Sequence, residues 1–353
     1  MDAWLDVAER TVSLGVREMA CRLNGDGKNF DKAAANLKRT AQVQLSGETL
    51  RVVVEAEGKR VLQAQRSGQL PVGWSAADCK TEEEKTTRLY LGSDGVMVPL
   101  VTDSEKLARR KTVKEKRRRR GKKARPLPTR KSGADQSYKE FKIVAFYDET
   151  QTHRLVCGTR GDCETAGRLM RREASRIQLD RADEKVGNVD GSPWIRNQVK
   201  RQSLPLDALG LDFYHLSENV HKARREIYGD DDEAGKQWVG QLLHVFKHEG
   251  YEAAWKQLLE WRITRTRGRA AADRLLNYVS ERREMIGYPK FQAKGWQIGS
   301  GPTEATCKTL TARLKGSGMR WDSDNAEAIM ALEALTQSDQ WDKYWETQLR
   351  QTS

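Results

Sequence analysis

The chain has 353 residues, of which 37% are hydrophobic and 32% are charged, so it can bury a core and still keep a very polar surface. The net charge of +13 favours a polyanionic partner, with nucleic acid as the first candidate and an anionic membrane surface as the alternative. No apolar run approaches the ~18 residues of a membrane span, and the charged opening segment MDAWLDVAER is unlike a secretory signal. Five cysteines without a CxxC spacing indicate a reducing compartment and argue against zinc fingers. We therefore expect a cytoplasmic protein with no membrane partner.

Residues 1–80 are expected to form a helical DNA-binding region that ends in a linker. Asp31 is a candidate cap for a short helix over Lys32–Thr40, and Ser46 is a good N-cap for a second helix with an apolar stripe interrupted by Gly58. Two short helices joined by a tight turn suggest a helix-turn-helix. An ordinary helical hairpin explains the same pattern.

Residues 81–216 are expected to form the first part of a mixed α/β core. Alternating apolar residues predict a strand in RLYLGSD, and GVMVPLV follows as a second strand that could pair with it. Further strands are expected at Phe141–Phe146, Leu155–Cys157, Val186–Val189 and Ala208–Phe213, with a helix at Cys163–Ile177 among them. This alternation is typical of an α/β domain and shows no internal repeat.

A basic segment, residues 106–131, marks the strongest change in composition. It carries 15 Lys or Arg and one acid, Glu115. Such a run cannot bury itself, so we expect it to be disordered until a partner neutralises it. Counterion release makes clustered cations effective contacts to nucleic acid, although a solvated loop without function is the alternative. The candidate contacts are Arg117, Arg118, Arg119 and Arg120.

Residues 217–290 should form an all-helical block, because apolar residues recur there at helical spacing, and residues 291–353 should return to the core. A further helix is expected at Asn325–Leu335. His244 and His248 lie four residues apart, but no third ligand nearby completes a zinc site.

Three acidic residues stand at the ends of expected elements. Asp94 and Asp190 each end an apolar run before a glycine, a pair that also forms ordinary turns. Glu304 follows Gly301, a candidate cap, and Pro302, so it lies in a first helical turn, where a carboxylate also suits the helix dipole without further role. Helical spacing places three polar residues on the face of Glu304: Lys308, Thr311 and Lys315.

Three carboxylates that folding brings together would suit divalent metal ions. Mg²⁺ prefers oxygen ligands, and Mn²⁺ is the expected substitute. Two such ions about 4 Å apart can activate a nucleophile and stabilise the leaving oxygen during in-line displacement at phosphorus. Without metal, neighbouring carboxylates raise each other's pKa.

Four passages carry a family resemblance: GSDGVMVPL, GNVDGSPWI, LDFYHLSENVHKA and IGSGPTEATCKTLTARLKGSGMRW. They resemble the DDE transposases of bacterial insertion sequences, in the Mutator-like branch and near the Kra-type elements, and the resemblance runs from Tyr90 to Trp345. It implies an RNase H-like core, interrupted by an all-α insertion at residues 217–290, in a nucleoid-associated bacterial protein. Asp94, Asp190 and Glu304 would be the catalytic metal ligands, and their spacings of 96 and 114 residues are compatible with that layout.

The same branch carries an Asp-x-x-His signature, which Asp212 and His215 match in DFYH. The resemblance implies that these two residues support the active centre. Asp212 also competes with Glu304 for the place of third metal ligand. A capping aspartate and a histidine at the edge of the core are the alternative.

The resemblance implies a transposase that cleaves element ends and joins them to target DNA, acting as a dimer or larger oligomer on double-stranded DNA. An RNase H-like nuclease for branched DNA or hybrids, without joining, is one alternative, and a catalytically silent DNA-binding relative is another. Trp321 could stack on an unpaired base or simply pack in the core. The candidate phosphate contacts near Glu304 are Lys308, Arg313, Lys315 and Arg320.

Overall fold

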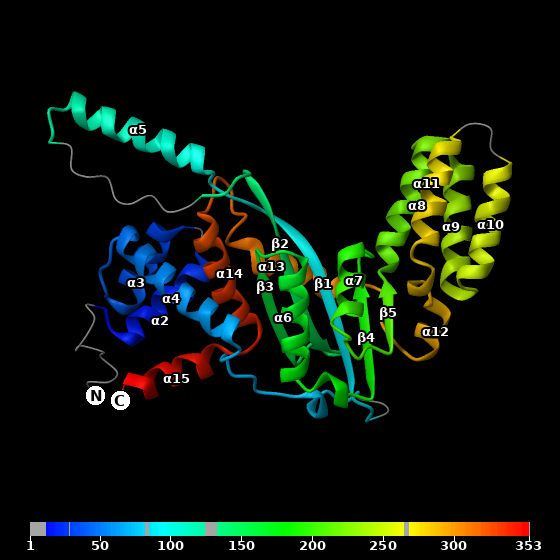
Figure 1. Cartoon of the computed structure of the whole chain (residues 1–353), viewed down its shortest axis with the longest axis horizontal. Coiled ribbons are helices and arrows are strands. Elements are labelled where there is room, and N and C mark those ends of the chain that lie inside the picture. The colour runs from blue at the N-terminus through cyan, green and yellow to red at the C-terminus, as the bar shows by residue number, and fades with distance from the viewer. Residues whose placement is uncertain (1–11, 28, 82–84, 124–132, 265–267, 353) are drawn as a thin grey trace.

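A mixed five-stranded sheet stands between two groups of helices in the computed structural model, which describes residues 12–27, 29–81, 85–123, 133–264 and 268–352 (Figure 1). The strands lie in the order β3-β2-β1-β4-β5. Strand β2 is antiparallel to β1 and β3, whereas β4 and β5 run parallel to β1. The expected α/β class is confirmed. The strands are β1 (Arg88–Pro99), β2 (Tyr138–Asp148), β3 (Arg154–Thr159), β4 (Glu184–Val189) and β5 (Ala208–Leu211).

Strand β1 is one continuous strand, and the expected pair of strands RLYLGSD and GVMVPLV is wrong. It pairs with β2 without a break from Leu89 opposite Asp148 to Pro99 opposite Tyr138. The unbroken ladder supplies hydrogen-bond partners on both sides of the Asp94–Gly95 pair, so the chain has no reason to turn there. Asp94 therefore lies within a strand and not at its end.

The two faces of the sheet carry different helices. Gly92 of β1 faces Thr303 of α13 (Gly301–Ala312), and Gly158 of β3 faces Met330 of α14 (Ser323–Gln337). The two glycines share a face because the strand register brings residues of the same parity together. The opposite face carries α7 (Pro193–Arg201) and its neighbour α6 (Cys163–Arg176), and Lys142 of β2 lies over the ring of Trp194 in α7.

The N-terminal helices α2 (Leu14–Asp26), α3 (Phe30–Ala41) and α4 (Gly47–Ser67) pack on one another and on α14. Asn29 caps α3, not Asp31, and the Ser46 cap of α4 is confirmed. Gly58 crosses α14 so closely that a Cβ would lie 2.7 Å from the carbonyl oxygen of Ala328. Because its middle is packed against another helix, α4 fits the helical-hairpin alternative better than a helix that enters a DNA groove.

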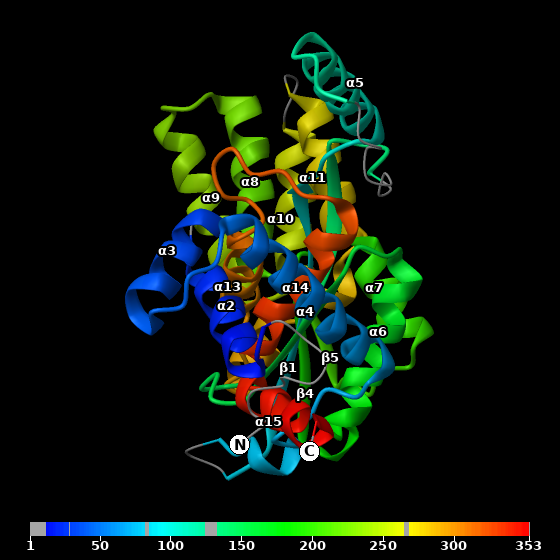
Figure 2. The same ribbon diagram turned by 90° about the vertical axis from the view of Figure 1, so that its left-hand side faces the viewer.

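Helix α5 (Asp103–Arg119) occupies most of the basic segment, so the expected disorder is wrong for these residues. Thr102 and Glu105 form a reciprocal capping box at its start, and cations in its last turn suit the helix dipole. None of its residues is buried, and it projects away from the rest of the chain in both views (Figures 1 and 2). Residues 124–131 of the segment lie outside the described residues.

The expected all-helical block lies at the far end of the sheet from the N-terminal helices (Figure 1). No helix among the described residues is long and apolar enough to cross a membrane. The expected strand at Ala208–Phe213 ends at Leu211, because Asp212 caps the next helix. The block comprises α8 (Phe213–Tyr228), α9 (Glu233–His248), α10 (Tyr251–Ile263) and α11 (Arg269–Ser280), followed by α12 (Tyr288–Ala293), and the described chain ends in α15 (Trp341–Thr352).

Candidate active site

Asp94 lies within β1, and Asp190 directly follows the neighbouring parallel strand β4. In each residue pair of β1 and β4 the two residue numbers differ by 96, from Arg88 with Glu184 to Leu91 with Gly187. Asp94 and Asp190 differ by the same 96 and follow three residues after the last pair, where the charge of Asp190 acts on Asp94. The sheet therefore brings two carboxylates together that are far apart in the sequence.

Helix α13 brings Glu304 to the same face of the sheet. A Cβ on Gly92 would collide with the side chain of Thr303, so only glycine lets the first turn of α13 approach β1 this closely. Because Gly92 and Asp94 are two residues apart on β1, both face α13. Ser300 occupies the N-cap position of this helix, one position earlier than the expected cap at Gly301, and Gly301 and Pro302 lie in its first turn.

The segment between the helical block and α13 is fastened to the ends of the strands. The backbone of Gln297 donates to Tyr90 Oη at 3.2 Å and accepts from Asn188 Nδ2 at 2.7 Å. The carbonyl of Ile298 accepts from the backbone of Phe213 at 2.9 Å. These bonds fix where the chain re-enters the core, and therefore where Glu304 lies.

Asp212 is fully buried, and both oxygens of its carboxylate accept hydrogen bonds from the backbone of the chain. One oxygen caps α8 by accepting from the backbone of Tyr214 and His215, at 2.5 and 3.0 Å. The other oxygen accepts a very short hydrogen bond from the backbone of Ser300. This is the capping alternative for Asp212, and it leaves Glu304 as the more accessible third carboxylate.

Glu304 and His215 face each other at the exposed side of the candidate site. Nε2 of His215 lies 3.9 Å from Oε1 of Glu304, and Nδ1 lies 3.3 Å from Glu218. The Glu304 side chain is 55% exposed, and its nearest hydrogen-bond donor is Ser300 Oγ at 3.4 Å. Glu304 is thus weakly held and can change rotamer at low cost.

The two aspartates form an anionic pair with little compensation. Burial raises the pKa of Asp94, and the negative charge of Asp190 adds to that rise, whereas the backbone N–H of Gly95 and the nearby His215 oppose it. Asp190 is oriented by Ser192, whose backbone N–H donates at 2.8 Å and whose hydroxyl donates at 2.5 Å.

Within the described part of the chain, no group of three or more His, Cys, Asp or Glu side chains is arranged closely enough to hold a metal ion. The closed three-carboxylate cluster is therefore not preformed there. What the structure brings together is an anionic pair, Asp94 and Asp190, with the exposed side chain of Glu304 on the neighbouring helix.

Only some of the expected nucleic-acid contacts near Glu304 are exposed. Lys308 and Lys315 lie on the surface of α13 and the turn after it, whereas Thr311 is buried and bonds back to the carbonyl of Cys307. Arg320 is partly exposed, and it donates to Leu100 O and to Glu105 at the start of α5.

The expectation that Arg313 and Trp321 face DNA is not met, because both are buried. The Arg313 guanidinium lies 5.0 Å from the ring of Phe30 and 5.1 Å from that of Trp321, and it donates to Asn24 at 3.0 Å. Burial lowers its pKa to about 10. These two residues dock the N-terminal helices, which is the core-packing alternative.

Sequence reasoning missed two residues of the helical block that lie beside Asp190. A Cβ on Gly191 would lie 2.7 Å from Nε of Arg282, a buried atom without a hydrogen-bond partner among the described residues. The Arg282 guanidinium stacks 4.0 Å from the ring of Tyr278, whose pKa burial raises to about 12. No local pattern marks either residue, because they are distant from Asp190 in the sequence.

Comparisons with known proteins give no family. No family model matches the chain, and no curated protein does. Among solved structures, the Drosophila P element transposase strand transfer complex is similar at 13% identity and a TM-score of 0.33, over 98% of this chain and 84% of that chain. A likeness at this TM-score carries no conclusion about fold or function.

Proposed function

We propose that the chain is a metal-dependent enzyme that cuts DNA and joins the cut ends to target DNA, in the manner of a DDE transposase with an RNase H-like core. The observation that carries the proposal is the placement of Asp94 on β1 near Asp190, which directly follows the neighbouring parallel strand β4. Helix α13 adds Glu304 on the same face of the sheet, which makes these three carboxylates the candidate metal ligands.

The residues present fit a hard divalent cation. Burial and Asp190 raise the pKa of Asp94, so the ionised carboxylate is disfavoured without a compensating charge, which a bound cation would supply. Carboxylate oxygens are the ligands that Mg²⁺ and Mn²⁺ take. When bound, such ions supply a nucleophile at neutral pH and stabilise the leaving oxygen.

The protein's own side chains would orient the metal ligands and the substrate. Ser192 and Gly95 orient the two aspartates through hydrogen bonds, and Asp212 fixes α8 and the Ser300 turn that precedes Glu304. Glu304 has the exposed side chain whose rotation would complete the ligand set. His215 lies next to Glu304, where it is placed to orient that carboxylate or to meet the DNA backbone.

DNA is the expected substrate because the chain presents exposed, clustered cations. Lys308 and Lys315 are exposed on and after the helix that carries Glu304, and the projecting helix α5 ends in Lys116, Arg117, Arg118 and Arg119. Clustered cations gain affinity for duplex DNA through counterion release. We propose double-stranded DNA as the partner and an oligomer as the active form.

The test is a set of isosteric variants, Asp94→Asn, Asp190→Asn and Glu304→Gln, assayed with labelled DNA in Mg²⁺. Each should lower cleavage by at least ~100-fold while DNA affinity stays close to that of the parent and the variant still unfolds cooperatively. Glu218→Gln, which removes an exposed carboxylate on the other side of His215, is the matched control and should keep cleavage.

The products decide between the proposed transposase and a simple nuclease. Joined strands of donor and target DNA support the transposase, whereas nicks without joined products support the nuclease alternative. Robust metal-dependent cutting by Asp190→Asn would overturn the assignment of the metal site. DNA binding without any metal-dependent product would leave a catalytically silent DNA-binding protein.

A further inference from the structure

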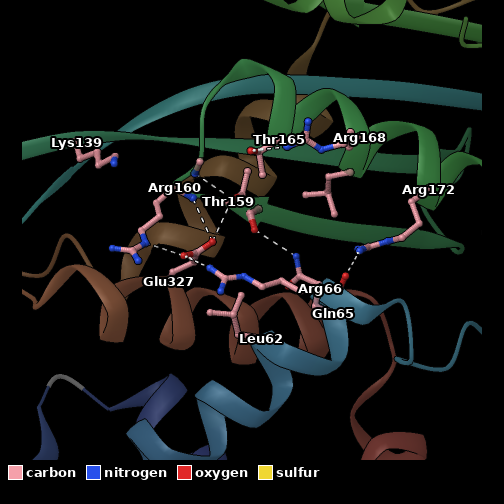
Figure 3. A pocket seen from close by; sticks show the side chains of 13 residues that line it. Leu62, Gln65, Arg66, Lys139, Thr159, Arg160, Thr165, Arg168, Arg172 and Glu327 are labelled. Atoms are coloured by element: carbon pink, nitrogen blue, oxygen red, sulfur yellow. Dashed lines mark hydrogen bonds and ion pairs between the residues drawn. The ribbon is translucent and has the colours of Figure 1, made fainter. Parts of the chain in front are cut away.

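A second concentration of positive charge lies at the free edge of the sheet, beside β3. A pocket of ≈ 690 Å³ opens there between α4, β3 and α6 (Figure 3). A second pocket of ≈ 360 Å³ continues it along α4 and shares the side chains of Arg66 and Arg160. We call the two together the edge groove. Its cationic lining consists of Lys59, Arg66, Lys139, Arg160, Arg168 and Arg172.

A buried carboxylate holds the centre of the edge groove in place. Glu327 of α14 is 1% exposed, and it receives Nε of Arg160 at 2.9 Å and Arg66 at 2.8 Å. These two guanidiniums, from the bend after β3 and from α4, therefore point toward the same carboxylate, as Figure 3 shows. Arg160 also pairs with Asp324 at 2.5 Å and donates to the hydroxyl of Ser323, whereas among the described residues the Arg66 guanidinium uses only its bond to Glu327. A guanidinium has five N–H donors, so Arg66 in particular retains donors for a ligand.

The outer cations of the groove add charge that nearby acids do not compensate. Lys139 and Arg168 are exposed, and neither pairs with a carboxylate within the described ranges. Arg168 donates only to the Thr165 hydroxyl, at 3.2 Å. Arg172 is fixed by Glu173 and by the carbonyl of Arg66. The groove therefore combines prearranged guanidiniums with exposed cations at its rim.

The position of the edge groove relates it to the candidate active site. Thr159 at the groove pairs with Lys142 on β2, and Lys142 pairs with Gly95 on β1, the residue after Asp94. Two inter-strand spacings separate Thr159 from Gly95, which is roughly 10 Å. The edge groove therefore lies at the same level of the sheet as Asp94, one strand beyond β2.

We propose that the edge groove binds the phosphate backbone of a nucleic-acid strand, as a second contact separate from the carboxylates. Arginine forks match phosphate oxygens in geometry and charge. The groove is two pockets long and lined by cations along its length, which suits successive phosphates better than one small anion. The inference extends the proposed function, but it requires only binding and no catalysis.

The test compares single charge reversals in the full-length chain by fluorescence anisotropy with a labelled duplex and a labelled single strand, in EDTA over a range of salt. Arg168→Glu and Lys139→Glu should each weaken binding about fivefold to tenfold. The slope of log affinity against log salt should fall by about 0.9 for duplex or about 0.7 for single strand per lost contact. Arg171→Glu is the matched control, because Arg171 is exposed on the same helix but does not line the groove.

Each outcome decides the proposal. If both groove variants bind like Arg171→Glu, or if the control weakens binding equally, the groove is not a nucleic-acid contact. A titration with tripolyphosphate distinguishes the source of the phosphate. If Arg168→Glu abolishes tripolyphosphate binding but leaves DNA affinity unchanged, the groove takes a small phosphate compound and the proposal is overturned.

Failure of this inference can be told apart from failure of the proposed function. Asp94→Asn should bind DNA as the parent does, because Asp94 does not line the groove. A chain that binds through the edge groove and never cuts would retain this inference and lose the proposed activity. If a chain with the charges of Arg168 and Lys139 reversed cut DNA normally, the proposed activity would stand and the proposed role of the edge groove would fail.

Discussion

Thr303 of α13 lies directly over Gly92 of β1, with no room for a side chain between them. This contact sets the distance between the helix that carries Glu304 and the strand that carries Asp94. Gly92→Ala should therefore push α13 outward, lower the free energy of unfolding by about 1–3 kcal/mol and abolish DNA cleavage. Urea unfolding and a cleavage assay measure the two effects.

Gly240→Ala is the matched control for this substitution, since Gly240 is exposed in α9 and a Cβ there would meet nothing within 4 Å. It should raise the free energy of unfolding by up to about 1 kcal/mol, because alanine is the better helix former. Full activity in Gly92→Ala would show that the approach of α13 to β1 does not position the site.

Asp94 should lower the stability of the metal-free protein. Burial and Asp190 raise its pKa in the folded state, so folding favours the protonated form, and the protein is stabilised as the pH falls through that raised pKa. At pH 7 the ionised carboxylate opposes folding. Asp94→Asn should therefore raise the melting temperature in EDTA, by roughly 2–4 °C for each kcal/mol gained, and should lose the stabilisation that Mg²⁺ gives the parent.

The control for Asp94 is Asp162→Asn. Hydrogen bonds from Thr165 lower the pKa of Asp162, an N-cap, so its charge favours folding and its loss should not raise the melting temperature. Thermal melts at pH 7 and pH 5, with and without Mg²⁺, give both comparisons. A lower melting temperature for Asp94→Asn than for the parent in EDTA would contradict the prediction.

Asp212 should contribute to the stability of the fold and not to metal binding. Asp212→Ala leaves the N-terminus of α8 uncapped and the buried N–H of Ser300 unpaired, so it should cost about 2–4 kcal/mol. Asp212→Asn keeps one acceptor oxygen and should cost less. Urea unfolding with a parallel Mg²⁺ titration tests this, and a large loss of metal affinity at unchanged stability would instead make Asp212 a ligand.

Variants of Arg313 and Lys308 should distinguish a residue that packs in the core from one that contacts DNA. Lys308→Ala should reduce the salt slope of DNA binding by about 0.9 without changing the melting temperature, because Lys308 is exposed. Arg313→Ala should leave the slope unchanged and cost about 2 kcal/mol of stability, because its guanidinium bonds to Asn24 and stacks on Phe30 and Trp321. If Arg313→Ala reduced the salt slope of DNA binding while keeping the stability of the parent, Arg313 would be a DNA contact.

Local sequence patterns predicted most of the elements that carry the site. Helical periodicity gave the block that became α8–α11 and the helix α14, and the apolar runs at Phe141, Leu155 and Val186 became strands. These features depend on the spacing of apolar residues and on caps such as Ser46, which act within a few residues of each other. The sequence also placed Glu304 in a first helical turn.

Tertiary structure decided the features that depend on distant partners. The Asp94–Gly95 pair stays extended because β2 continues the ladder past it, and Asp212 is withdrawn from solvent because Ser300, far along the chain, folds back onto it. Arg313 is buried because the N-terminal helices supply Phe30 and Asn24 around it. Burial and hydrogen-bond pairing are properties of the folded chain, so no local pattern could have distinguished these residues from exposed aspartates and arginines.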